Sequence, residues 1–274
     1  MIDPELARAD AFARRIDERM ATRVVPFPGG VAYLDDDFPI RFTANYLWVD
    51  EPGAAPAEHW IAETDRILGG AGRTHRKVMF ADPNVSDRLA MDLIDHGFVH
   101  DKSVLLIQRE VPEREHAVDH IEEVSFAELR PLLLEIQRRY TSTATERENE
   151  QLVDFHGKME RVVGARFFLA RVGDEPAGCC ELYVDGDLAQ VESVDTLEEF
   201  RGRGLASAFV LRAAAEGRAA GAEQVFLWAD AEDWPQHWYA RLGFREASRS
   251  ADFTRWPPGQ GPLAASAAGK SPDG

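Results

Sequence analysis

The sequence has little cysteine and no long apolar run. Its two cysteines, Cys179 and Cys180, are adjacent in a chain of 274 residues, which excludes a framework of several disulfides and predicts a reducing compartment, the cytoplasm. No apolar run approaches the roughly 20 residues that span a membrane as a helix. The N-terminal segment MIDPELARADAFARRIDERM has a charged helical pattern and lacks the apolar core of a secretory signal. We therefore expect a soluble, cytoplasmic protein without a membrane partner.

Positive charge is scarce as well. Lys and Arg number 31 against 48 Asp and Glu, which gives a formal net charge of −17. Because binding along a nucleic-acid backbone needs a basic surface, no nucleic-acid partner is expected. The acidic balance suits cationic substrates such as amines, and it equally suits a surface that only keeps the protein soluble.

The stretch from Ala189 to Ser207, AQVESVDTLEEFRGRGLAS, carries the strongest local signal. It begins as a strand in which apolar and β-branched residues lie among polar ones. A turn with Gly202 and Gly204 follows, and an alanine-rich helix is predicted from Ala206 to Ala220. Glycines allow backbone conformations that a side chain disfavours, and the first N–H groups of a helix have no intrahelical partner. The arrangement predicts a site for a phosphate-bearing cofactor, although a plain strand-to-helix turn would use the same residues.

The residues downstream distinguish these two possibilities. A second strand is predicted over Gln224–Asp230, and a short helix ends in Tyr239-Ala240-Arg241-Leu242-Gly243-Phe244. This order resembles the GNAT superfamily of acyl-CoA-dependent N-acetyltransferases. Arg201 to Ala206 match the family's pyrophosphate loop, Q/R-x-x-G-x-G/A, and Tyr239 to Phe244 match its later Tyr-x-x-Leu-Gly-Phe signature. The resemblance covers about residues 118–256.

The resemblance implies that acetyl-CoA is the co-substrate and that no metal takes part. It assigns to the cofactor the residues that pair with the pantetheine arm and those of the loop and helix start, namely Val194, Asp195, Thr196, Arg201, Gly202, Arg203, Gly204, Leu205, Ala206 and Ser207.

The same resemblance suggests the catalytic groups. Tyr239 matches the family residue that protonates the departing sulfur, with a packed aromatic as the alternative role. Family members often carry a catalytic Glu on the opening strand, but at one such position this chain has Gln190, which cannot act as a base. Glu192, one pleat away on the same face, is the possible general base, or else a solvated or substrate-orienting carboxylate. Where the family often has Asn, seven residues before the Tyr, this chain has Glu232.

The N-terminal half has a similar but less distinct order of predicted strands and helices. Strands are predicted over Arg41–Val49 and Lys77–Ala81, with helices over Ala57–Leu68 and Ser86–His96. The loop Asp50–Pro56 lacks the Arg-x-x-Gly-x-Ala pattern, so we interpret residues 1–115 as a degenerate GNAT-like domain without a cofactor loop; an unrelated α/β domain is the alternative. Residues 116–256 form the predicted catalytic domain, with helices expected over Phe126–Tyr140 and about Glu146–Val163 and the last strands over Arg245–Trp256. Residues 257–274 are expected to be a disordered tail. The expected fold class is α/β (α+β), with a mixed, mostly antiparallel sheet flanked by helices in two tandem domains.

Other candidate sites receive less support from the pattern. Cys179 and Cys180 are expected to be buried packing residues rather than nucleophiles. Two histidine pairs, His96 with His100 and His116 with His120, have a spacing that could suit a metal on a helix, but no matching carboxylate or cysteine accompanies them. A group of three tryptophans could line an acceptor pocket, with core packing as the preferred role: Trp228, Trp234 and Trp238.

Together these observations predict an N-acetyltransferase that moves an acetyl group from acetyl-CoA directly to a primary amine. The alternative is a non-catalytic acyl-CoA-binding or regulatory module in which the loop survives without the chemistry. The acceptor amine is not identified, and the chain is expected to act as a monomer or a homodimer. A fold by itself does not imply a substrate.

Overall fold

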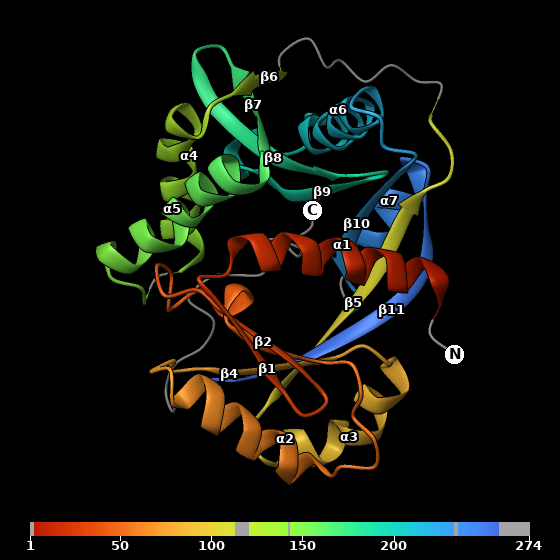
Figure 1. Ribbon diagram of the computed structural model, residues 1–274. Helices are drawn as coiled ribbons and strands as arrows, with labels where there is room; N and C mark the ends of the chain where they lie inside the picture. Colours follow the sequence, from red (N-terminus) through yellow and green to blue (C-terminus); the bar gives the residue numbers. More distant parts are fainter. Residues whose placement is uncertain (1–2, 113–120, 142, 233–234, 258–274) are drawn as a thin grey trace. The chain divides into compact units, whose positions relative to one another are not determined.

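A computed structural model describes residues 3–112, 121–141, 143–232 and 235–257. The chain divides into two compact units (Figure 1). Residues up to Ser103, together with the segment that begins at Arg249, form the first unit, and Val104–Ser248 form the second. The eleven strands follow the order β1-β2-β3-β4-β11-β5-β10-β9-β8-β7-β6, and most neighbours are antiparallel. The fold class expected from the sequence is thereby confirmed.

The first unit is built from the N-terminal elements and parts of two longer strands. Its elements are α1 (Pro4–Met20), β1 (Arg23–Phe27), β2 (Gly30–Leu34), the 3₁₀ turn η1 (Phe42–Ala44), β3 (Tyr46–Val49), α2 (Ala57–Thr64), the π-helical turn η2 (Asp65–Gly69), β4 (Arg76–Phe80), α3 (Pro83–Asp95), the first part of β5 (Val99–Gln108) and the second part of β11 (Phe244–Arg255).

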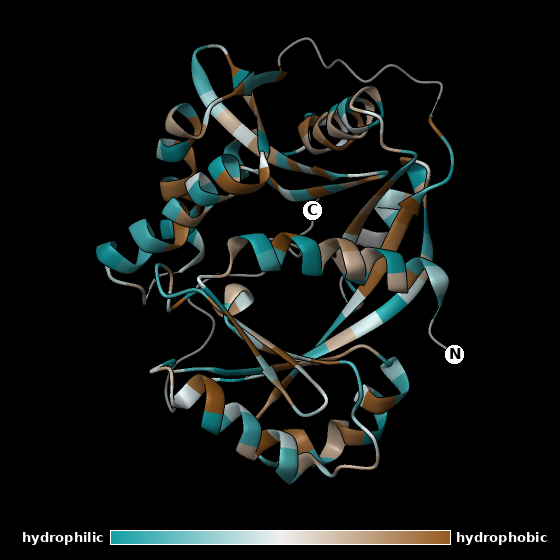
Figure 2. Ribbon diagram, viewed as in Figure 1, coloured by the Kyte–Doolittle hydropathy of each residue, from teal (hydrophilic) through white to brown (hydrophobic). Residues whose placement is uncertain are grey.

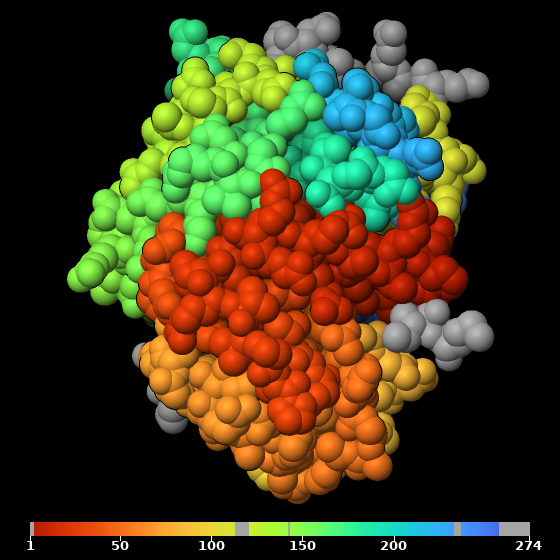
Figure 3. Space-filling view, in the orientation of Figure 1, coloured from red at the N-terminus to blue at the C-terminus, as the bar shows by residue number. Residues whose placement is uncertain are grey.

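Helices cover both faces of the sheet in the first unit. On one face, α2 and α3 bury apolar residues of alternate strand positions, including Leu47, Val49 and Phe80. On the other face, α1 contacts the polar ends of aromatic residues, and Tyr46 Oη donates a hydrogen bond of 2.5 Å to Asp17 Oδ2. Figure 3 shows α1 and the β1–β2 hairpin, in red and orange-red, on the surface of this unit.

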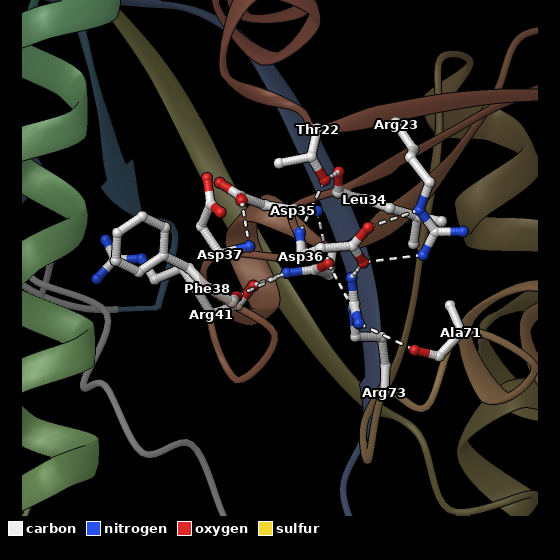
Figure 4. A network of polar contacts seen from close by, with 11 residues as sticks. Thr22, Arg23, Leu34, Asp35, Asp36, Asp37, Phe38, Arg41, Ala71 and Arg73 are labelled. Atoms are coloured by element: carbon white, nitrogen blue, oxygen red, sulfur yellow. Dashed lines mark hydrogen bonds and ion pairs between the residues drawn. The ribbon is translucent and has the colours of Figure 1, made fainter.

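A polar network ties the loop after β2 to the segment before β4 (Figure 4). The buried Arg73 guanidinium donates to Asn45 Oδ1 at 2.7 Å and to Asp36 Oδ1 at 2.6 Å. The Asn45 amide nitrogen donates to the carbonyls of Phe38 and Arg41. These contacts hold Phe42–Ala44 in a 3₁₀ turn, so the predicted strand Arg41–Val49 is shortened to its second half.

The second unit contains most of the remaining elements. They are β6 (Ile121–Val124), α4 (Phe126–Tyr140), α5 (Glu146–Val163), β7 (Arg166–Val172), β8 (Glu175–Asp185), β9 (Leu188–Thr196), the 3₁₀ turn η3 (Glu198–Phe200), α6 (Leu205–Ala219), β10 (Gln224–Asp230) and α7 (Pro235–Arg241), with parts of β5 and β11.

Local sequence explains where the helices of the second unit begin and end. Capping boxes start α4 at Ser125 and α5 at Thr145, and α5 stops at Gly164, which has a left-handed φ of 73°. One face of the sheet packs against α6, where Phe209 and Ala213 are fully buried. Figure 2 shows the mostly apolar α6 in brown and the polar outer side of α5 in teal.

Most elements of this unit agree with the sequence-based prediction, α4, α5 and β10 to the residue. The prediction did not include β1, β2 or β6. It also assigned Arg245–Trp256 to the C-terminal half alone, whereas Asp252–Arg255 of β11 pair with β4 of the first unit. Strand partners far apart in sequence leave no local signal, because pairing is decided by tertiary contacts. The expected disordered tail lies outside the described residues except for Pro257. Within the described ranges, none of the helices combines the length and apolar composition that a membrane crossing requires.

Candidate active site

The glycine loop between β9 and α6 has the geometry of an anion cradle. Gly202 and Gly204 adopt left-handed φ angles of 73° and 76°, and Gly204 is the N-cap of α6. A Cβ added at either position would meet no atom within 4 Å. The loop therefore needs glycine for its backbone conformation, while the space above it stays open to a ligand.

The first turn of α6 presents free backbone donors beside this loop. Ala208 makes the first helical hydrogen bond, to the Gly204 carbonyl at 3.1 Å, so the preceding N–H groups point away from the helix. They border an open hollow in the surface, which we call the α6 hollow. Its lining residues are Thr196, Phe200, Arg201, Gly202, Arg203, Gly204, Leu205, Ala206, Ser207 and Trp238. All the loop and helix-start residues predicted for the cofactor are thus brought together, with Thr196.

Side chains fix the walls of the α6 hollow. The Arg203 guanidinium lies 5.8 Å from the Phe200 ring centroid, and Arg201 Nε donates to the Thr196 carbonyl at 3.4 Å. Trp238 Nε1 donates to Ser207 Oγ at 3.2 Å, which joins α7 to the first turn of α6. Two cations therefore border the N-terminus of a helix, where the dipole also favours negative charge.

Thr196 contributes a hydroxyl that the protein itself does not satisfy. Its side-chain oxygen is buried and has no hydrogen-bond partner among the described residues. Burying an unpaired hydroxyl carries a free-energy cost of about 1–3 kcal/mol. Because Thr196 lines the α6 hollow, a bound ligand can supply the missing partner.

Strand β9 separates from β10 next to the hollow. The parallel pairing joins Leu188–Gln190 to Gln224–Phe226, although the two strands run on to Thr196 and Asp230. Backbone groups in the second half of β9 are therefore turned toward a gap between strands. This half contains Val194, Asp195 and Thr196, the residues expected to pair with the pantetheine arm.

A β-bulge in the same half of β9 reorients its side chains. The register pairs Glu192 with Glu181 and Asp195 with Cys179, so β9 has one residue more than β8 over this interval. Ser193 has a φ of 51°, the one positive value for a non-glycine residue in the described part of the chain. Since partners Cys179 and Glu181 are two residues apart, Glu192 and Asp195 lie on the same face. Bulges of this kind commonly re-aim a side chain beside an active site.

The carboxylates on this face are held by neighbouring polar groups. Gln190 Nε2 donates to Glu192 Oε2 at 2.6 Å, and Tyr140 Oη donates to Asp195 Oδ1 at 2.9 Å. Burial raises the pKa of Asp195 to about 6, with a further upward contribution from Glu181. Asp195 was expected to act through its backbone; its side chain adds a titratable group near neutral pH.

Tyr239 lies on α7 between two aromatic rings. Its ring centroid is 4.7 Å from that of Trp238 and 5.9 Å from that of Phe244. Burial raises the pKa of the Tyr239 phenol well above its usual range, and the negative charges of Glu192 and Asp195 add to the effect. The phenol is therefore protonated at neutral pH and lies within electrostatic reach of both predicted strand carboxylates.

The other candidates have structural roles. Cys179 and Cys180 are free and fully buried, which confirms them as packing residues, and burial raises both thiol pKa values. His96 Nδ1 lies 2.7 Å from the Asp92 carbonyl, and His100 stacks on Phe253 with ring centroids 4.5 Å apart. His116, His120 and Trp234 lie outside the described residues. Among those described, no group of three or more potential metal ligands is found.

Sequence reasoning missed several residues of this region. Phe200 lines the α6 hollow, Tyr140 binds Asp195, and the buried Glu181 is paired with His156. Trp238, which the sequence suggested for an acceptor pocket or for the core, is buried and lines the α6 hollow. Period-two alternation along β8 could have placed Glu181 opposite Glu192 once the hairpin at Gly186 was recognised. Tyr140 and His156 lie on helices far from β9 in sequence, and nothing local signals their position.

Comparison with known proteins identifies relatives of this architecture. A model of the acetyltransferase (GNAT) family matches residues 130–244. A functionally unknown conserved protein from Staphylococcus epidermidis is 15% identical, with a TM-score of 0.67 over 86% of this chain and 94% of that chain. A GCN5-related N-acetyltransferase from Kribbella flavida is 21% identical, with a TM-score of 0.62 over 95% and 98% of the two chains.

A tandem GNAT protein from the clavulanic acid biosynthesis pathway is also similar. It is 15% identical, with a TM-score of 0.52 over 82% of this chain and 78% of that chain. At these identities the likeness concerns the fold. A search of the curated proteins gave no significant match.

Proposed function

Residues 130–244 are a GNAT acetyltransferase domain, and from this premise we propose that the chain transfers an acetyl group from acetyl-CoA to a primary amine. The family and fold imply acyl transfer from an acyl-CoA. The observation that carries the proposal is the α6 hollow, where a glycine loop, a helix start and two arginines meet beside a gap between strands.

The residues of the α6 hollow fit the pyrophosphate of an acyl-CoA. The N–H groups at the start of α6 would donate to phosphate oxygens, and Arg201 and Arg203 would neutralise their charge. The unpaired Thr196 hydroxyl would gain a partner from the same ligand. The backbone of Val194 to Thr196 would pair with the pantetheine arm as an added strand, and its N–H groups would stabilise negative charge on the thioester oxygen.

Glu192 is proposed as the group that takes the proton from the amine. A lysine-like amine with a pKa of about 10.4 is neutral in only about one molecule in two thousand at pH 7. A carboxylate within reach of the ammonium would assist the loss of this proton by accepting it, which leaves the nitrogen lone pair free to attack the acetyl carbon. Gln190, which binds the other side of the Glu192 carboxylate, would hold it in place.

Tyr239 is proposed as the general acid. As the new carbon–nitrogen bond forms and the carbon–sulfur bond breaks, the phenol would give its proton to the departing sulfur and regain one from the new amide nitrogen. One proton per turnover then leaves through Glu192 to solvent, so protons balance. Burial and the nearby negative charges raise the pKa of Tyr239, so the phenol carries its proton at neutral pH, as a general acid must. Negative charge that develops on the departing sulfur would then draw this proton.

For the first unit, we propose a degenerate GNAT-like domain without a cofactor loop. The order β3-α2-β4-α3-β5 matches β9-α6-β10-α7-β11 of the second unit. This similarity of order supports the proposal, together with the absence of the Arg-x-x-Gly-x-Ala pattern from residues 50–56.

The test is turnover of acetyl-CoA against a panel of amines. Release of the free thiol would be followed for small monoamines, diamines and peptides with lysine, and acetylated products would be identified by mass. Amine-dependent thiol release is expected. Binding of acetyl-CoA without release on any amine would instead favour a non-catalytic acyl-CoA-binding module. No binding of CoA in a thermal-shift or calorimetric experiment would refute both.

A further inference from the structure

The second unit buries a glutamate that its fold does not require. Glu181 on β8 has no exposed surface, and its carboxylate receives a hydrogen bond of 2.5 Å from Tyr183 Oη. His156 Nδ1 on α5 lies 2.6 Å from the other carboxylate oxygen. A buried ion pair commonly gives no more stability than apolar residues of similar volume. The pair is therefore a candidate for a role other than stability.

The Glu181–His156 pair lies next to the residues of β9 that are proposed to take part in acetyl transfer. Glu181 is directly opposite Glu192 in the β8–β9 register, a position that brings Cβ atoms to about 4.5–5.5 Å. The bulge at Ser193 then places Asp195 on the same face, opposite Cys179. The buried pair and the two carboxylates of β9 thus share one side of two neighbouring strands, the side opposite α6.

Several charged and titratable groups face Asp195. They are Cys179 and Glu181 on β8, Glu192 on β9, His156 on α5, Tyr140 on α4, Tyr239 on α7 and Arg201 in the loop. Burial is the largest influence and raises the pKa of Asp195 to about 6. Glu181 raises it further, whereas the Tyr140 hydrogen bond, Arg201 and His156 lower it. Glu181 and His156 therefore act on Asp195 with opposite sign.

We propose that Asp195 shares with Glu192 the role of accepting the single proton of the acceptor amine, and that the Glu181–His156 pair is a positioning group that controls how readily Asp195 does so. The inference rests on the proposed function. In the proton transfer, a nitrogen–hydrogen bond of the ammonium breaks and an oxygen–hydrogen bond forms on Asp195, which leaves a neutral amine. The carboxylate later returns that proton to solvent, and no other reactant is needed.

Two isosteric variants give opposite expectations for the rate profile. Glu181→Gln removes a negative charge, so Asp195 loses its proton more easily and the acidic limb of kcat/KM moves to lower pH. His156→Gln removes the imidazole that lowers the pKa of Asp195 and moves the same limb to higher pH. Each shift is expected to be about one pH unit, the size expected for a charge at this range in a protein interior. A merely structural role for the pair would not produce shifts of opposite sign.

The experiment measures kcat/KM for acetyl transfer between pH 5 and 9 in the full chain. The parent, Glu181→Gln and His156→Gln would be compared with Glu223→Gln, an exposed residue of the same unit expected to leave the profile unchanged. Asp195→Asn should remove the contribution of Asp195 to the acidic limb and lower kcat at pH 7 by about tenfold, while Glu192 carries the remaining turnover. Thermal unfolding and CoA binding of each variant check that the fold is kept, and Tyr183→Phe is the substitute if Glu181→Gln does not fold.

A direct titration separates this inference from the proposed function. With carbon-13-labelled aspartate, the Asp195 carboxyl signal is assigned through Asp195→Asn, and its midpoint is measured in each variant without any turnover. Opposite shifts in both the titration and the rate profile support the inference. If the protein turns over but the rate profiles and the Asp195 midpoints are the same in the parent and in both variants, the inference is overturned and the proposed function is not. Absence of turnover on any amine overturns the proposed function, and the titration then still decides whether Glu181 and His156 control Asp195.

Discussion

The two units contain the same order of strand, loop, helix, strand, helix and strand, yet their loops differ. In the second unit, β9 and β10 pair over their first three positions and then separate. In the first unit, β3 and β4 pair up to their last residues, Val49 with Phe80. The first unit therefore has no comparable gap between its two parallel strands.

The loop that follows the first of the two parallel strands also differs between the units. After β3, the N–H groups of Asp50 and Glu51 both donate to the Gly29 carbonyl, which ties the loop to the β1–β2 turn. A Cβ on Gly29 would lie 2.8 Å from the Glu51 carbonyl oxygen, so the backbones are in close contact. After β9, the glycine loop is open and carries arginines. After the first of the two parallel strands, the chain thus continues into an open glycine loop in the second unit and into a loop held by a neighbouring turn in the first unit.

The largest difference in effect between the two units is expected for two tyrosines, one in each unit. Tyr239→Phe should lower kcat by about 10²-fold or more, because the sulfur loses its proton donor, with little change in KM or unfolding. Tyr46→Phe should lower the free energy of unfolding by about 1–3 kcal/mol, because the half-buried Asp17 loses its donor, and should leave kcat unchanged. Steady-state kinetics and denaturant melts measure both. Equal kcat for Tyr239→Phe and the parent would remove Tyr239 from the proposed mechanism.

A glycine in each loop provides the next test. Gly204 and Gly53 both have left-handed φ angles, 76° and 55°, and open space at the Cβ position. Alanine at either position costs roughly 1–2 kcal/mol of backbone strain. Gly204→Ala should also weaken CoA binding by about tenfold, a difference of about 1.4 kcal/mol, whereas Gly53→Ala should leave it unchanged. Calorimetric titration with CoA measures these affinities. Equal affinities of Gly204→Ala and the parent would show that the loop does not hold the cofactor.

Two threonines give the smallest expected effect. Thr196→Val removes a buried hydroxyl without a partner among the described residues, so the free protein should be as stable as the parent or more so. CoA affinity should fall roughly fivefold, the value of one hydrogen bond near 1 kcal/mol. Thr64→Val in α2 removes a hydroxyl that donates to the Ile61 carbonyl at 2.8 Å. We expect it to lose stability and keep CoA affinity. A Thr196→Val variant with unchanged affinity would mean that no ligand atom satisfies this hydroxyl.

The sequence predicted the second unit better than the first for a physical reason. Its helices α4 and α5 carry complete capping boxes and begin and end where the pattern placed them. The first unit begins with a hairpin whose strands are short, and Pro26 lies inside β1, so its pattern is weak. Most of the α6 hollow could likewise be predicted, since its lining residues lie close together in sequence.

By itself, the sequence determined the features that depend on neighbouring residues. Glycine at positions 202 and 204 fixes the turn because other residues disfavour its φ angles, and the residues that follow form a helix with its donors exposed. Only the tertiary structure decided that a bulge turns Asp195 to the face of Glu192, that His156 lies against Glu181, and that Trp238 closes the α6 hollow. These contacts depend on strand register and helix packing between distant segments, which local propensity does not specify.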